Sequence, residues 1–134
     1  MTKLIDIEGV GPAYAAKLQK AGVRSAGALL ERGGTPAGRK EVAAASGVSE
    51  VLILEWVNHV DLFRIKGVGS EYADLLEAAG VDTVIELAQR NVENLHPKLI
   101  AYNQQKKLVR RPPGANQVHN WIQQAKKLPR KISY

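Results

Sequence analysis

The residues with the clearest capacity for chemistry lie in a segment that occurs twice. The stretch Ile7–Val23 returns 58 residues later as Ile65–Val81, and both copies read Ile-x-Gly-Val-Gly-x-x-Tyr-Ala-x-x-Leu. The glycines permit backbone angles that a side chain would hinder, so the chain can reverse tightly between two helices with the valine packed between them. Free N–H groups at the start of the second helix, together with its dipole, then form a phosphate site that reads backbone and not base sequence.

The side chains around the two hairpin turns, Glu8–Gly11 and Lys66–Gly69, leave a second interpretation open. Glu8 flanks the first turn, and Glu71 and Asp74 follow the second. A carboxylate suits the start of a helix but repels a phosphate placed there. The same glycines would also be needed simply to close two helices without any ligand. The turns are therefore either phosphate sites or purely structural.

Basic side chains gather after Glu93, where the sequence has no carboxylate. Such a block is typical of a surface that binds phosphate or another polyanion, with a solvated, solubilising surface as the alternative. The basic loop, Lys106–Gly114, has only the short Ser46–Ser49 as its counterpart in the first copy. Its Arg110 and Arg111 suit bidentate contact with phosphate or carboxylate. The nine basic residues are Lys98, Lys106, Lys107, Arg110, Arg111, Lys126, Lys127, Arg130 and Lys131.

Other kinds of chemistry lack the residues they need. The chain has no cysteine, which excludes disulfides and thiolate sites. His59, His96 and His119 fall on separate predicted elements without ligand spacing, so we expect no metal and no cofactor. No nucleophile–base grouping or paired-carboxylate signature is present, and we expect no enzymatic activity. The chain begins without an apolar signal region and has no apolar run near the ~20 residues of a membrane span, which favours a cytoplasmic protein.

The elements that position these residues are expected to be helices, because helical spacing dominates and sustained alternation is absent. Pro12 and Gly22 mark the start and the left-handed end of the helix after the first turn. In the first half the predicted helices cover residues 3–7, 12–21, 25–31, 35–45 and 49–64.

The second half repeats this plan with differences in its last two helices. Helices are predicted over residues 70–79 and 83–90, the latter with a Thr83/Glu86 capping box. His96–Pro97 is expected to open a helix to about Leu108, and Asn116 to cap a last helix that Pro129 stops. Trp56 and Trp121 are expected to be core anchors, and Tyr14 and Tyr72 to be half-buried.

The repeat predicts an all-α protein of tandem helix-hairpin-helix repeats. Its two five-helix units are expected at residues 1–64 and 65–134. Domains of this size bury only about 60% of their unfolded surface, so we expect the two units to pack together.

Two known modules resemble the first copy. The stretch Ile7–Leu18 with Ala21–Val23, Ala28–Leu29 and Ala45–Ser49 resembles the small N-terminal domain of archaeal and eukaryotic RecA-type recombinases. It also resembles the C-terminal domain of the bacterial RNA polymerase α subunit. The fit covers most of residues 4–62 and, more loosely, 63–128. With Asp61–Gly69 and Lys127–Tyr134, the whole chain resembles an uncharacterised bacterial family, a domain of unknown function in the helix-hairpin-helix group.

The resemblance implies a fold that binds DNA without sequence preference, and modules of this kind also serve as protein-docking units. It implies backbone phosphate donors at Gly9, Val10, Gly11 and Ala13, and at Gly67, Val68, Gly69 and Glu71. The basic residue that often follows such a hairpin is absent from positions 12–14 and 70–72.

Two functions follow as hypotheses. The first is non-catalytic, sequence-nonspecific binding of DNA or another nucleic acid through the hairpin amides and the basic C-terminal surface. The second is a protein-interaction adaptor that keeps the fold without binding DNA. The candidate contact residues are Gly9, Val10, Gly11, Ala13, Lys17, Lys66, Gly67, Val68, Gly69, Lys106, Lys107, Arg110, Arg111, Lys126, Lys127, Arg130 and Lys131.

Overall fold

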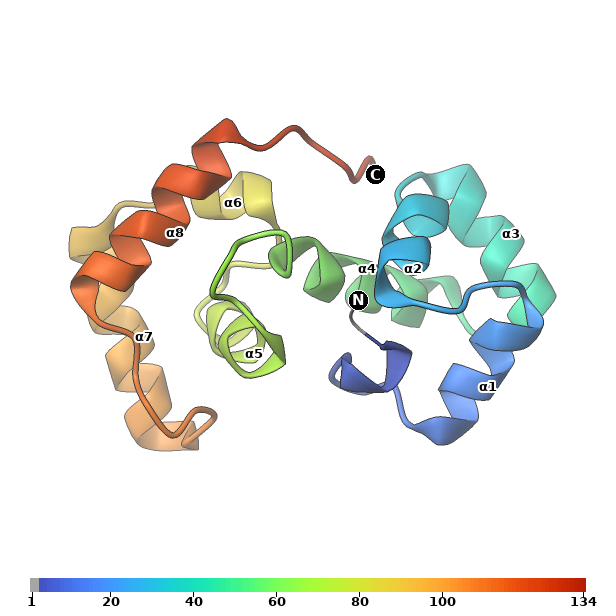
Figure 1. Cartoon of the computed structure of the whole chain (residues 1–134), viewed down its shortest axis with the longest axis horizontal. Coiled ribbons are helices and arrows are strands. Elements are labelled where there is room, and N and C mark those ends of the chain that lie inside the picture. Colours follow the sequence, from blue (N-terminus) through green and yellow to red (C-terminus); the bar gives the residue numbers. More distant parts are fainter. Residues whose placement is uncertain (1–2) are drawn as a thin grey trace. The chain divides into compact units, whose positions relative to one another are not determined.

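The structure, a computed structural model, describes residues 3–134, and within that range every regular element is a helix (Figure 1). The predicted all-α class is therefore confirmed. Residues 1 and 2, the start of the predicted first unit, lie outside the described residues. No helix between residues 3 and 134 is both long enough and apolar enough to cross a membrane.

The helices fall into two compact units. The first unit comprises the residues up to Asp61 together with Lys131–Tyr134, and the second comprises Leu62–Arg130. The first holds the 3-10 helix η1 (Leu4–Asp6) and the α-helices α1 (Pro12–Lys20), α2 (Ala26–Gly33), α3 (Pro36–Ser46) and α4 (Glu50–Leu62), the last ending at the boundary. The second holds α5 (Ser70–Ala78), α6 (Val84–Ala88), α7 (Val92–Lys106) and α8 (Ala115–Lys127).

The second unit thus has four helices of its own where five were expected. In place of η1 it has a turn that follows directly on α4, in which the Ile65 N–H donates to the Leu62 carbonyl at 3.1 Å. The Ile7 N–H donates to the Leu4 carbonyl at 3.1 Å in the same way in the first unit. The residues before each hairpin turn therefore have matching backbone bonds, although only the first set forms a separate helix.

Side-chain caps set the helix starts in the first unit. The hydroxyl of Ser25 accepts from the Ala28 N–H at 3.1 Å, and that of Thr35 accepts from the Gly38 N–H at 3.0 Å. Such caps satisfy N–H groups that have no partner within the helix. These predicted caps are confirmed. The helices bury an apolar core that includes Leu18, Val23, Leu29, Val42 and Ile53.

Caps and core follow the same rules in the second unit. The Thr83 hydroxyl accepts from the Glu86 N–H at 3.3 Å, which confirms the predicted start of α6. The Glu86 carboxylate returns to the N–H of Asp82 at 2.9 Å. The core of this unit includes Leu76, Val84, Leu87, Leu99 and Trp121.

The predicted start of α7 is wrong. The helix begins at Val92 and not at His96–Pro97, because the Asn91 side chain accepts from the Asn94 N–H at 3.0 Å and caps the helix earlier. Pro97 then lies inside the helix, where it removes one backbone hydrogen bond without ending the element. At the other end α7 stops at Lys106, since Lys107 turns into the left-handed region (φ 51°).

The predicted cap of α8 is also wrong. Gly114 is the cap residue, with extended backbone and no side-chain hydrogen bond, so Asn116 lies within the first turn of the helix. The carbonyl of Gly114 accepts from the Val118 N–H at 3.1 Å, which fixes this register. The helix ends at Lys127, two residues before Pro129, as expected.

Candidate functional site

The two hairpin turns have the same backbone geometry. Gly9 (φ +88°) and Gly67 (φ +96°) both occupy the left-handed region that favours glycine. The following valines, Val10 and Val68, are 3% and 5% exposed, so each fills the space between the helices as the repeat predicts.

An aromatic pair supports each turn from behind. A Cβ atom on Gly9 would lie 3.4 Å from Nε1 of Trp56, and one on Gly67 would lie 3.2 Å from Nε1 of Trp121. The rings of Tyr14 and Trp56 are 5.1 Å apart between centroids, as are those of Tyr72 and Trp121. Both tryptophans are buried and both tyrosines half-buried, as predicted. Each turn is therefore held against its own unit by an equivalent aromatic contact.

The helix that follows each turn starts without a side-chain cap. Gly11 precedes α1 and Gly69 precedes α5, both with extended backbone and no side-chain hydrogen bond to the helix. The first intrahelical bonds run to Ala15 and Ala73 from the carbonyls of these glycines. N–H groups earlier in each helix, such as those of Ala13 and Glu71, therefore have no intrahelical acceptor. Both starts are able to receive an acceptor from outside, such as a phosphate oxygen.

In the second unit the basic loop lies beside this helix start. An open hollow of ≈ 500 Å³ is lined by Glu71 from α5 and by Lys107, Arg110 and Pro112 from the loop, with Asn103, Leu108 and Val109 at its back. The hydroxyl of Tyr72 donates to the carbonyl of Arg111 at 2.9 Å, which ties the loop to α5. Two cations thus approach a helix start that has no base in its own sequence, although Glu71 shares the hollow with them.

The backbone of the basic loop is anchored, while its arginine side chains are not. The Asn103 side chain accepts from the Val109 N–H at 2.9 Å and donates to the Val109 carbonyl at 3.2 Å. The His96 ring lies 3.0 Å from the carbonyl of Pro113. The side chains of Arg110 and Arg111 are exposed and make no hydrogen bond or ion pair within the described part of the chain. The loop therefore presents two solvated guanidinium groups from a fixed backbone.

Gln124 joins α8 to the second hairpin turn, a contact that the sequence analysis missed. Its side chain accepts from the Lys66 N–H at 2.8 Å and donates to the Lys66 carbonyl at 3.1 Å. A signal was present in the spacing of the tryptophans, because Trp56 and Trp121 are 65 residues apart whereas the turns are 58 apart. With that longer offset Gln124 occupies the position of His59, in the helix that supports the turn.

The predicted contact residues divide between the two units. The second unit contains the hairpin residues Lys66, Gly67, Val68 and Gly69 and the basic residues Lys106, Lys107, Arg110, Arg111, Lys126, Lys127 and Arg130. The first unit contains Gly9, Val10, Gly11, Ala13, Lys17 and also Lys131. Lys17 lies with its Nζ 5.7 Å from the centre of the Tyr14 ring, and Lys106 with its Nζ 6.0 Å from that of Tyr102. The second unit thus combines a hairpin turn with most of the basic residues.

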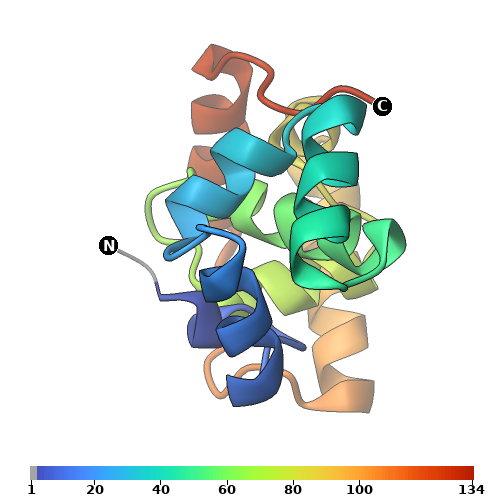
Figure 2. The same ribbon diagram turned by 90° about the vertical axis from the view of Figure 1, so that its right-hand side faces the viewer.

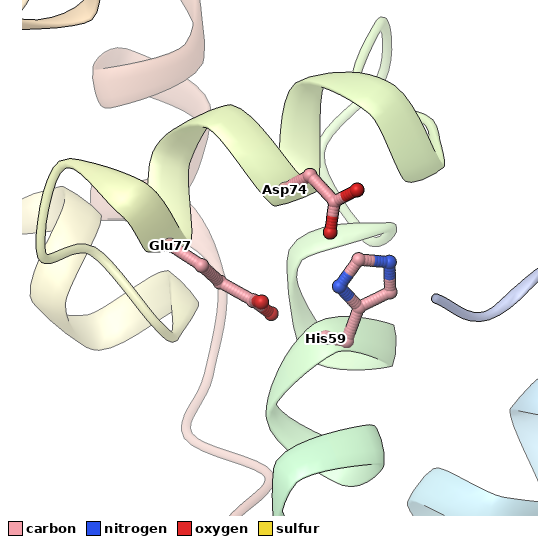
Figure 3. A group of neighbouring side chains, drawn as sticks. All are labelled: His59, Asp74 and Glu77. Atoms are coloured by element: carbon pink, nitrogen blue, oxygen red, sulfur yellow. The ribbon is translucent and has the colours of Figure 1, made fainter. Parts of the chain in front are cut away.

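Carboxylates of the second unit lie on and after α5. Figure 3 shows Asp74 and Glu77 projecting from the same face of that helix, and it also draws His59 on α4. Because His59 belongs to the first unit, neither unit by itself holds three metal-ligating groups together in residues 3–134. The pKa of Asp82 is raised above its ordinary value of 3.8, first because burial penalises the charged form and then because Glu77 adds negative charge.

Comparison with known proteins gives one match. A family model, the domain of unknown function DUF4332, matches residues 8–128. The chain belongs to the DUF4332 family. Membership supplies no activity, because the family is itself a domain of unknown function. Neither the curated proteins nor the solved structures contain a match to this DUF4332 chain.

Proposed function

We propose that this DUF4332 protein binds the phosphate backbone of nucleic acid, and of DNA in particular, without catalysis and without reading base sequence. The observation that carries the proposal is the position of the basic loop beside the uncapped start of α5 in the second unit. The charge comes from one part of the chain and the N–H donors from another, and both border the same open hollow.

We infer that each unit is a helix-hairpin-helix module, which makes the chain a tandem repeat of that motif. The matching φ angles of Gly9 and Gly67, the buried valines after them and the two tyrosine–tryptophan pairs support this inference. In such a module the turn sets the direction of the second helix, so its N–H groups face a phosphate that follows the surface.

The second unit is the stronger of the two proposed contacts. Arg110 can engage a phosphate in bidentate fashion, and Lys107 adds a point charge on the same side of the hollow. Backbone amides of Gly67, Val68, Gly69 and Glu71 would supply hydrogen bonds that need no side chain. Glu71 weakens this arrangement, because its carboxylate lies in the same hollow.

The first unit would add a weaker contact. Its turn offers the amides of Gly9, Val10, Gly11 and Ala13, with Lys17 as the nearest base on α1. Glu8 stands next to the turn, and no basic loop borders the start of α1 in the way that Lys106–Gly114 borders α5. Its contribution to affinity should therefore be smaller than that of the second unit.

The second candidate function is a protein-interaction adaptor. Glu8 and Glu71, one beside each turn, favour it, because a carboxylate at the turn opposes phosphate and suits a basic or amide-rich protein partner. In that case the guanidinium groups of Arg110 and Arg111 would meet carboxylates of the partner.

Charge reversal in the basic loop tests the proposal. The variant Arg110→Glu/Arg111→Glu should weaken binding to a labelled DNA duplex by about 100-fold at low salt, because two phosphate contacts become repulsive. The matched control is Arg24→Glu/Lys40→Glu, which changes the net charge equally at exposed positions of the first unit that border neither turn. Equal losses in the two variants would mean that net charge alone governs binding. No duplex binding by the unmodified protein, with a protein partner still captured by the Arg110→Glu/Arg111→Glu variant, would favour the adaptor.

A further inference from the structure

Lys131–Tyr134, which we call the strap, lies on the first unit and is bound there mainly through its backbone. The Ser133 N–H donates to the carbonyl of Gly34 at 2.7 Å, and the Ser133 carbonyl accepts from Arg39 Nη2 at 2.9 Å. Ile132 is 3% exposed, and the Tyr134 hydroxyl lies 3.3 Å from Oδ1 of Asn58. In Figures 1 and 2 this last red segment runs beside the turn between α2 and α3.

The surface under the strap, formed by Gly33, Gly34, Arg39 and Asn58, is shaped for a main chain. A Cβ atom on Gly34 would come within 2.6 Å of the Lys131 carbonyl oxygen, so any side chain there would displace the strap. Gly34 has ordinary right-handed helical angles (φ −69°, ψ −20°), which alanine also adopts. Its lack of a side chain is therefore explained by the close approach of the strap and not by its own backbone.

Arg39 gives this surface its chemical preference. The side chain is 6% exposed and donates to two backbone carbonyls, that of Gly33 at 2.9 Å and that of Ser133 at 2.9 Å. No carboxylate pairs with it within residues 3–134. A buried charge that loses a hydrogen-bond partner is costly, so the surface without a strap would favour another peptide carbonyl in the same place.

The repeated architecture does not require this surface. Gly34 precedes the cap of α3, and the residue that precedes the cap of α7 is Arg90. Arg39 lies four residues after the cap of α3, and the corresponding residue of α7 is the buried, apolar Leu95. The second unit therefore keeps the helices but has neither the open glycine nor the buried guanidinium.

We propose that this surface is a docking site for an extended peptide of a partner protein, and that the chain's own strap occupies it in the absence of the partner. The pattern of the strap states the chemistry of the partner: a buried aliphatic residue, then a small residue whose N–H and carbonyl meet Gly34 and Arg39, then an aromatic residue. Pairing one residue through both backbone groups is the way in which extended peptides add to an exposed edge.

Occupation by the strap makes the site closed by default. A tethered segment competes with an effective concentration in the millimolar range, so a free peptide binds detectably only when the strap is removed or when the peptide binds much more tightly. The site is independent of the proposed nucleic-acid contacts, except that Lys131 belongs to both sets.

The test uses the strap sequence itself as the probe. A fluorescent peptide of residues 128–134 should bind in a saturable way to a variant that ends at Arg130, as measured by anisotropy. Binding should be at least about tenfold weaker to the unshortened chain, whose site is occupied, and to the shortened chain with Gly34→Ala. Absence of binding to the shortened, folded variant would overturn the proposal, and so would equal binding with and without Gly34→Ala.

A second measurement covers the case in which the shortened variant does not fold. In the unshortened chain, Gly34→Ala should expel the strap and raise the rate of tryptic cleavage after Lys131 by about tenfold, because cleavage needs a locally released backbone. Gly27→Ala is the matched control, since Gly27 lies in α2 and a Cβ atom there would meet nothing within 4 Å. Equal cleavage rates in the two variants would overturn the proposal.

Discussion

The two units of this protein have the same hairpin turn but differ in the connection that precedes their last helix. In the first unit Gly47 ends α3 in the left-handed region (φ +75°), and Ser49 caps α4 two residues later through its bond to the Leu52 N–H at 3.2 Å. In the second unit the same place holds Lys107–Gly114, with four basic or proline side chains on an anchored backbone. The short connection adds no charge, whereas the long one adds the basic loop.

The difference shows how a repeated framework acquires a specialised surface. The turn, the valine and the tyrosine–tryptophan pair position N–H donors in both units. Only the second unit places cations next to those donors, and only the first has a surface for the strap. We therefore assign nucleic-acid contact mainly to the second unit and peptide docking to the first.

Removal of the tryptophan behind each turn should have the largest effect. Trp56→Ala and Trp121→Ala should each lower the free energy of unfolding by about 3–5 kcal/mol, since both side chains are buried against a hairpin glycine. Urea denaturation followed by circular dichroism measures this loss. A large effect for one tryptophan and almost none for the other would mean that the turns are not equivalent.

The glycines of the second turn should differ in their tolerance of alanine. Gly67→Ala should destabilise the protein by about 1–2 kcal/mol, because φ is +96° and the new Cβ would lie 3.2 Å from Trp121 Nε1. Gly69→Ala should change stability little, since Gly69 has φ −99° and a Cβ there meets no atom within 4 Å. Thermal unfolding of the two variants side by side gives the answer, and a reversed order would contradict the geometry of the turn.

Neutralising the carboxylate in the hollow should strengthen binding in the second unit more than in the first. Glu71→Gln should raise the affinity for duplex DNA by about threefold, because it removes repulsion next to Lys107 and Arg110. Glu8→Gln is the matched change in the first unit and should have a smaller effect. Titrations of both variants at the same salt concentration test the assignment, which fails if Glu8→Gln has the larger effect.

Asp82 should make a small, pH-dependent difference in the second unit. Its pKa is raised in the folded state, so the folded protein binds the proton more tightly and loses stability as pH rises from 3.8 through the raised value. Asp82→Asn should therefore stabilise the protein at neutral pH, and this gain should shrink toward pH 3.8. Urea denaturation across this range measures the gain. A gain that stays constant with pH would show that ionisation of Asp82 is not its cause.

Local signals in the sequence were enough to predict much of the fold. Ser25, Thr35 and Thr83 cap helices through side-chain bonds to residues three positions away, and such bonds depend little on the rest of the molecule. The start of α7 was missed because Asn91 and His96–Pro97 both carry a start signal, and the sequence does not show which one the packing selects.

The site depends on contacts between residues far apart in the sequence, which no local pattern contains. The basic loop was predicted as a charged insertion, but its place beside α5 follows from the bond between Tyr72 and Arg111, 39 residues apart. The strap was likewise assigned to the basic surface, whereas Ser133 bonds to Gly34, 99 residues earlier. Charge and turn geometry could be read from the sequence, and their combination could not.

The most direct test of the central claim is fluorescence anisotropy of a labelled DNA duplex with the purified protein at about 50 mM and about 200 mM salt. We predict micromolar or tighter binding at the lower concentration that weakens steeply at the higher one, with log K falling by about 0.9 per phosphate neutralised. Single-stranded and junction DNA in the same assay would show which form fits the two units best. Absence of binding at the lower salt concentration, or binding that does not respond to salt, would contradict the account.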